Sequence, residues 1–78
     1  MTSFTEFKVG DLVFSDGNNF RVWTVVETAR VGVKLKCSHF RDGNKVGAKL
    51  DSHNIVEPDW FTGNPRILHV VSRSARVV

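Results

Sequence analysis

The chain has 78 residues, of which 41% are hydrophobic, and carries 11 Lys and Arg against 8 Asp and Glu, giving a formal net charge of +3. A chain of this length buries only about 60 to 65% of the surface that its unfolded form exposes, so it supports one hydrophobic core and leaves little room for a deep catalytic cleft. We therefore expect a single domain over residues 1–78 that is not an enzyme.

The charge is unevenly distributed along the chain. Residues 1–59 hold all the acidic residues and an equal number of basic ones, so the net positive charge falls on Arg66, Arg73 and Arg76. A neutral body with a basic C-terminal end suits a polyanionic partner. We expect residues 73–78 to form a basic tail that frays from the domain.

The N-terminal residues, MTSFTE, lack the basic and long apolar regions of a secretory signal, and apolar runs elsewhere are far shorter than a bilayer span. The single cysteine, Cys37, cannot form an internal disulfide, which fits a reducing compartment. The sequence therefore predicts a soluble, cytoplasmic protein without a membrane partner.

Alternation with a period of two, which is typical of strands, recurs along the chain, whereas helical periodicity does not. Residues 20–28, FRVWTVVET, carry large apolar side chains on both faces, which predicts a central, strongly curved strand. Residues 31–38 alternate most cleanly, with Lys34 and Lys36 on one face. The apolar face of that segment consists of Val31, Val33, Leu35 and Cys37.

A second alternating segment covers residues 45–51, where Val46, Ala48 and Leu50 share one face. We expect residues 33–37 to pair with residues 45–50 as a hairpin around the intervening reversal.

Two similar stretches, FSDGNNF at residues 14–20 and FRDGNKV at residues 40–46, lie between strand-like segments. Asp-Gly and Gly-Asn supply the positive φ that tight reversals need. A calcium loop needs alternating oxygen ligands and a distal Glu, and neither stretch has that spacing. Both stretches therefore predict turns rather than metal sites.

The C-terminal third is rich in turn formers over residues 58–65, which predicts an irregular loop or a single helical turn. Residues 66–72, RILHVVS, then read as a last strand with Ile67, His69 and Val71 opposite Leu68 and Val70. The sum is five or six short strands without a convincing helix. The predicted fold is all-β, a small five- or six-stranded antiparallel barrel.

The segment FKVGDLV at residues 7–13, followed by a reversal and FRVWTVVE, resembles the start of Src-homology-3-like small barrels of the KOW and Tudor groups. The resemblance covers about residues 7–57. It implies that Gly10 permits the turn into the first strand, that Asp11 holds this turn by bonding local amides, and that residues 52–56 form a short closing strand.

A basic strand face is the leading candidate for function. With the expected hairpin pairing, four lysines project from the same side and Arg41 lies at the connecting tip: Lys34, Lys36, Lys45 and Lys49. Such a row of cations could follow a phosphate backbone, extended by Arg66, Arg73 and Arg76, while an exposed Trp23 or Trp60 could stack on an unpaired base. The competing interpretation is that the lysines only solubilise a sheet edge.

The loop around Trp60 and Phe61 supports an alternative function. Two large aromatic residues beside turn formers would anchor a protein-protein contact if they were exposed, or would cap the barrel as core if they were not. This alternative describes an inhibitor, an accessory factor or a homo-oligomer assembled through strand edges. The sequence leaves both functions open, with nucleic acid or another protein as the partner.

Catalytic and metal sites are not predicted. Cys37, His39, His53 and His69 lack the paired spacing of a zinc site, and Cys37 belongs to an apolar strand face that keeps a thiol unreactive. The sequence shows neither a glycine-rich phosphate loop nor a pair of catalytic carboxylates. We expect no cofactor.

Overall fold

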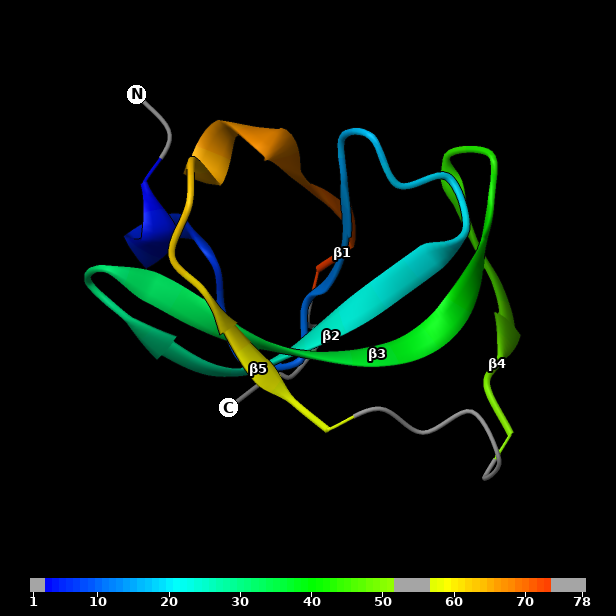
Figure 1. Ribbon diagram of the computed structural model, residues 1–78, viewed down its shortest axis with the longest axis horizontal. Coiled ribbons are helices and arrows are strands. Elements are labelled where there is room, and N and C mark those ends of the chain that lie inside the picture. Colours follow the sequence, from blue (N-terminus) through cyan, green and yellow to red (C-terminus); the bar gives the residue numbers. More distant parts are fainter. Residues whose placement is uncertain (1–2, 52–56, 74–78) are drawn as a thin grey trace.

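The computed structural model describes residues 3–51 and 57–73. In these two ranges the chain forms six strands and two 3₁₀ turns (Figure 1): η1 Phe4–Glu6, β1 Leu12–Ser15, β2 Arg21–Ala29, β3 Gly32–Asp42, β4 Lys45–Lys49, β5 Asp59–Phe61, η3 Pro65–Ile67 and β6 Leu68–Ser72. Every strand pairing is antiparallel. The predicted all-β antiparallel fold is confirmed.

The six strands form one sheet in the order β4-β3-β2-β1-β6, and β5 pairs with β3 beside this path. The first half of β3 pairs with β5 and its second half pairs with β4, so the long strand carries two different neighbours along one edge (Figure 1). The sheet curls through 214° into a half-barrel.

Two irregularities bend the central hairpin of β2 and β3. Val22 pairs with His39 while Trp23 pairs with Cys37, which makes Ser38 an extra residue in β3. Val25 pairs with Leu35 while Glu27 pairs with Lys34, which makes Val26 an extra residue in β2. Such bulges increase the local bend and twist of a strand. The predicted central, curved strand is therefore present as β2.

Both Asp-Gly-Asn stretches form turns, as predicted. Gly17 has a φ of 84° and Gly43 a φ of 61°, the left-handed region that glycine adopts without a steric penalty. In the first turn, the side-chain oxygen of Asn18 accepts hydrogen bonds from the backbone N–H groups of Phe20 and Arg21, at 2.9 and 3.1 Å. The Asn thus fixes the point at which β2 begins.

The turn before β1 also follows the expectation from the resemblance. Gly10 has a φ of 98°, and the Asp11 carboxylate accepts a hydrogen bond from the backbone N–H of Lys8 at 3.0 Å. Asp11 is fully buried.

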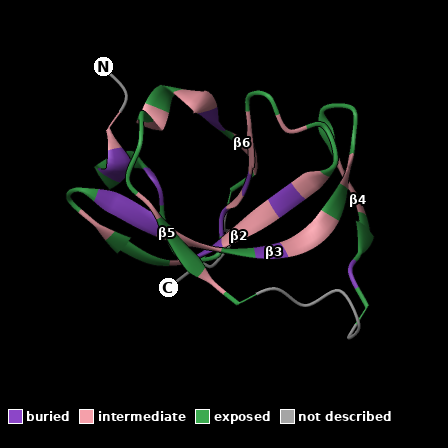
Figure 2. Cartoon of the chain, viewed as in Figure 1, coloured by how far each residue is buried: buried purple, intermediate pink, exposed green. Residues whose placement is uncertain are grey.

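The core lies against one face of the curled sheet (Figure 2). Its buried members come from the N-terminal segment and four strands: Phe4, Phe7, Val13, Val25, Val33 and Leu68. Trp23, Leu35, Phe61 and Val70 pack partly buried against them. Because β2 contributes both Trp23 and Val25 to this core, the alternating residues Val22 and Thr24 face the other side of the sheet.

The predicted pairing of residues 33–37 with residues 45–50 is wrong. The two-residue reversal at Gly43 and Asn44 sets Asp42 opposite Lys45, and pairing proceeds outward from there to His39 opposite Lys49. Because a short turn determines hairpin register, the five residues of β4 cannot reach the first half of β3. β5 occupies that position, pairing Val33 with Phe61.

Three smaller predictions also need correction. Val31 is 74% exposed, because it lies in the tight turn between Ala29 and Gly32 rather than on the apolar face of β3. Residues 59–61 form β5 instead of an irregular loop, and the last strand begins at Leu68 after a 3₁₀ turn. The predicted closing strand at residues 52–56 and most of the predicted tail lie outside the described residues.

Candidate functional site

The face of the sheet opposite the core, which we call the polar face, carries the candidate site. Residues that pair across an antiparallel ladder project to the same side. Trp23 and Val25 contact the core, so Val22 and Thr24 project to the polar face together with their partners His39 and Lys36. Lys49, the partner of His39 on β4, projects there too.

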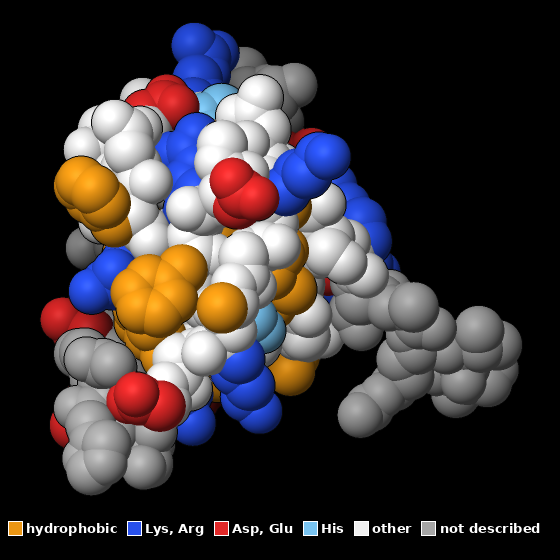
Figure 3. Space-filling view, turned by 90° about the vertical axis from the view of Figure 1, so that its right-hand side faces the viewer, with side chains coloured by type: hydrophobic (Ala, Val, Ile, Leu, Met, Phe, Trp, Pro, Cys, Tyr) orange, Lys and Arg blue, Asp and Glu red, His pale blue; other side chains and the backbone are white. Residues whose placement is uncertain are grey.

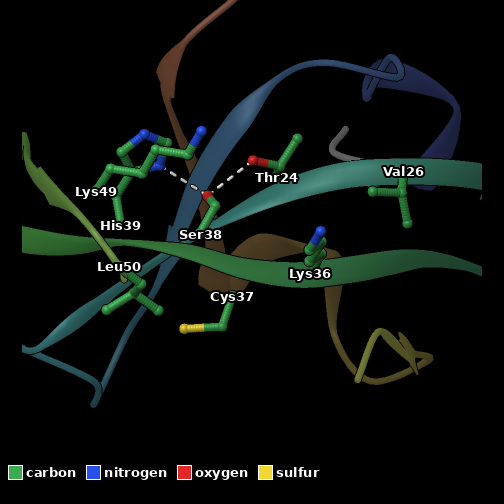
Figure 4. A pocket seen from close by; sticks show the side chains of 8 residues that line it. All are labelled: Thr24, Val26, Lys36, Cys37, Ser38, His39, Lys49 and Leu50. Carbon is green, nitrogen blue, oxygen red and sulfur yellow. Dashed lines mark hydrogen bonds between the residues drawn. The ribbon is translucent and has the colours of Figure 1, made fainter. Parts of the chain in front are cut away.

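A groove of about 540 Å³ opens between β2, β3 and the end of β4. It is lined by Thr24, Val26, Lys36, Cys37, Ser38, His39, Lys49 and Leu50 (Figure 4). Cys37 and Leu50, both buried, lie on the opposite side of β3 from Thr24, Ser38, His39 and Lys49 (Figure 4). None of the described lining residues is acidic.

A chain of hydrogen bonds orients the polar groups of the groove (Figure 4). The Thr24 hydroxyl donates to Ser38 Oγ at 2.7 Å, and Ser38 Oγ lies 2.7 Å from His39 Nδ1. The second acceptor within reach of Ser38, the Val22 carbonyl, is 3.5 Å away. We therefore assign the Ser38 hydroxyl as the donor to Nδ1, and in a neutral ring this assignment leaves the proton of His39 on Nε2.

The basic side chains that line the groove therefore offer hydrogen-bond donors to a ligand. The ammonium groups of Lys36 and Lys49 and the Nε2–H of His39 all belong to its lining, and both lysines are exposed. A lining with three such donors and, among the described residues, no carboxylate favours an anion, and phosphate oxygens are the commonest anionic acceptors in nucleic acids.

The lining thiol is not poised for chemistry. Burial raises the pKa of the Cys37 thiol, and the nearby Arg21 charge opposes this only in part. A thiol with a raised pKa is mostly protonated at neutral pH and is a poor nucleophile.

The four lysines predicted to share one side do not all do so. Lys34 pairs with Glu27 on β2 and with Trp60 on β5, on the same side of β3 as Lys36. Lys45, in contrast, pairs with Asp42 and projects to the opposite side from Lys49. The reason is a register shift in the β3–β4 ladder, where one extra β4 residue between Val46 and Lys49 reverses the alternation.

Arg41 lies at the hairpin tip, as predicted, but its guanidinium is bonded within the fold. It donates to the Gly43 carbonyl and to the Asn18 carbonyl, both at 2.6 Å, and its central carbon lies 3.7 Å from the centroid of the Phe14 ring. Phe14 in turn contacts the ring of His69, which lies 2.7 Å from the Asp16 carboxylate. Arg41 thus joins the two Asp-Gly-Asn turns to each other.

Two of the three predicted C-terminal arginines, Arg66 and Arg73, lie away from the groove. Arg66 belongs to η3, which is on the opposite side of the molecule from β4 (Figure 1). Arg73 donates to the Glu6 carbonyl at 2.9 Å and lies 3.5 Å from the Asp11 carboxylate. Arg76 is outside the described residues.

The alternative interaction loop divides between core and surface. Phe61 packs edge-on against Phe4, with ring centroids 6.1 Å apart, whereas Trp60 is 40% exposed next to Lys34. Trp23 packs against the core.

The sequence patterns did not reveal Phe20, Thr24, Ser38 and His39 as site residues. Phe20 is 72% exposed, although its ring was expected in a strand with two apolar faces. Figure 3, which views the molecule from the β4 side, shows exposed hydrophobic side chains with both Lys and Arg and Asp and Glu side chains around them. The sequence signal for these residues was that Thr24 and Ser38 are polar positions within the strand-like segments that carry the lysines.

Comparison of the chain with protein-family models, with curated proteins and with solved structures finds no match. Among the described residues, no helix is long and apolar enough to span a bilayer. The same residues contain no group of three or more His, Cys, Asp or Glu side chains suited to a metal ion.

Proposed function

We propose that this protein is a non-enzymatic module that binds nucleic acid, with the groove between β2, β3 and β4 contacting the phosphate backbone. The observation that carries the proposal is the lining of the groove, which brings Lys36, Lys49 and the His39 imidazole together. Lys34 continues the positive charge along the same side of β3. This set is smaller than the predicted row, because it excludes Lys45, Arg66 and Arg73.

The fold supports this proposal. A curled antiparallel sheet offers a rigid, bent surface on which side chains from several strands converge. The resemblance of residues 7–57 to Src-homology-3-like barrels of the KOW group is in keeping with such a role, and we include that finer assignment in the proposal.

Charge reversal tests the proposal against a matched control. Lys49→Glu should weaken binding of an oligonucleotide, whereas Lys45→Glu, on the same strand but the other side of the sheet, should weaken it much less. Fluorescence titrations at several salt concentrations measure both affinity and its salt dependence.

The logarithm of the affinity should fall linearly with the logarithm of the salt concentration, by about 0.7 per phosphate contacted on a single strand and about 0.9 on a duplex. Loss of Lys49 should reduce that slope by about one contact. Equal effects of Lys45→Glu and Lys49→Glu would show that net charge alone drives binding, and absence of binding at low salt would refute the proposed function.

The exposed Trp60 supports a second candidate function, a protein-protein contact along β5. In the described part of the chain, β5 pairs with β3 alone, so its other edge is open for a further strand. Binding of this kind should persist at moderate salt and be lost in Trp60→Ala. Sedimentation at several protein concentrations distinguishes self-association from binding to another protein.

A further inference from the structure

The backbone of Phe20 is held by two hydrogen bonds, and its ring is 72% exposed. Its backbone N–H donates to the Asn18 side chain at 2.9 Å, and its carbonyl accepts the N–H of Arg41 at 2.8 Å. The residue therefore sits at the ordered start of β2 rather than in a loose loop. An exposed aromatic ring that projects from a hydrogen-bonded backbone is available for contact with a ligand.

The ring is close to the groove and on the same side of the sheet. Phe20, Val22 and Thr24 alternate along β2, and their partners across the ladder are Arg41, His39 and Lys36. Phe20 is therefore a diagonal neighbour of His39, which places their Cα atoms about 7–8 Å apart. An aromatic surface and a phosphate-binding donor set thus adjoin on one face.

The neighbours of Phe20 favour an electron-rich, anionic ligand. Arg41 lies directly opposite in the ladder, and its guanidinium is fixed over the Phe14 ring. Lys49 lies beyond His39 on β4. Any of the nucleobases can stack on a phenyl ring, while the phosphates of the same strand contact the neighbouring cations.

We propose that Phe20 is a stacking platform for an unpaired nucleobase, which makes single-stranded nucleic acid the preferred ligand of the groove. This inference rests on the proposed function. In a duplex each base is already stacked on its neighbours, so its face reaches a protein ring only after unstacking. A single strand exposes that face without this energetic cost.

The test measures binding of a fluorescent thymidine oligonucleotide and of a duplex of the same length. The single strand should bind more tightly than the duplex, and Phe20→Ala should weaken single-strand binding about tenfold or more while leaving duplex binding unchanged. Phe20→Tyr, which keeps a flat ring, should restore binding, whereas Phe20→Leu, which keeps only apolar volume, should not.

Val31→Ala is the matched control, because Val31 is 74% exposed and lies in the turn at the other end of the β2–β3 hairpin from Phe20. It should leave both affinities unchanged. Thermal unfolding should show that each variant retains its fold, since neither side chain is buried.

The outcomes separate the two proposals. If both nucleic acids bind and Lys49→Glu weakens them, but Phe20→Ala leaves single-strand binding intact, the stacking platform is refuted and the proposed function stands. If neither nucleic acid binds at low salt, both are refuted. Self-association that depends on Phe20 would instead assign the exposed ring to a contact between copies of the chain.

Discussion

At the scale of single residues, Arg41 shows how a side chain expected to serve a ligand serves the fold. Its two short hydrogen bonds end on carbonyls of different turns, Asn18 in the first and Gly43 in the second. The guanidinium also covers the Phe14 ring. A planar group with several fixed donors is suited to this bridging, and an ammonium group is not.

We therefore expect Arg41→Lys and Arg41→Ala to destabilise the protein by similar amounts, about 1.5–3 kcal/mol, because a lysine cannot reach both carbonyls in this geometry. Urea unfolding followed by circular dichroism measures the difference. Arg21→Lys is the control, since Arg21 lies 4.9 Å from the Phe40 ring in a cation–π contact that a lysine can also make. A fully stable Arg41→Lys variant would contradict the bridging role.

At the scale of elements, two glycines of the β3–β4 hairpin have different reasons to be glycine. Gly43 has a φ of 61°, and a Cβ added there would meet nothing within 4 Å. A Cβ on Gly47 would lie 2.8 Å from the Phe40 carbonyl oxygen across the ladder. The first position is constrained by backbone conformation and the second by the close approach of β3.

Substitutions at these positions should separate the two constraints. Gly43→Ala should cost about 1–2 kcal/mol, and Gly43→Asn should cost less, because Asn tolerates the left-handed region. Gly47→Ala should cost more than Gly43→Ala, and Gly47→Asn should not recover stability, because a backbone oxygen blocks any side chain. Thermal or urea unfolding of the four variants checks this order, and a stable Gly47→Ala variant would contradict it.

At the scale of the whole molecule, Asp11 links segments that are distant in sequence. Its fully buried carboxylate accepts from the Lys8 N–H and lies 3.5 Å from the guanidinium of Arg73, just after β6. Arg73 also donates to Glu6, at the end of η1. The carboxylate therefore connects the N-terminal segment, β1 and the end of the chain's last strand.

Asp11→Ala should lower the free energy of unfolding by about 2 kcal/mol, because it removes the carboxylate that accepts the Lys8 N–H and faces Arg73. Asp16→Ala is the control, since it removes an exposed hydrogen bond with the His69 ring and should cost only about 0.5 kcal/mol. Urea unfolding of both variants provides the comparison. Equal losses would show that Asp11 is no more important than a surface charge.

Local features of the sequence predicted the all-β class, the antiparallel arrangement and both glycine turns. Alternation in residues 32–37 correctly separates Val33 and Cys37 from Lys34 and Lys36, and Asp-Gly-Asn correctly indicates a reversal. These predictions succeed because pleat and turn geometry depend on neighbours within a few residues.

The candidate site was only partly predictable, because its composition depends on register. Lys36 and Lys49 are brought together, while the extra β4 residue between Val46 and Lys49 turns Lys45 away. Ser38 and His39 join them through the bulge in β3. The alternation pattern of a single strand cannot predict where a bulge occurs in its pairing with another strand.

The chain's own sequence thus determined that it folds into a small antiparallel sheet with two tight reversals, since each of these follows from short-range steric and hydrophobic preferences. Only the tertiary structure decided which half of β3 pairs with β4, where Arg41 finds its acceptors and which cations share a face with Phe20. Those outcomes depend on how the curled sheet buries its core, which is a property of all the strands together.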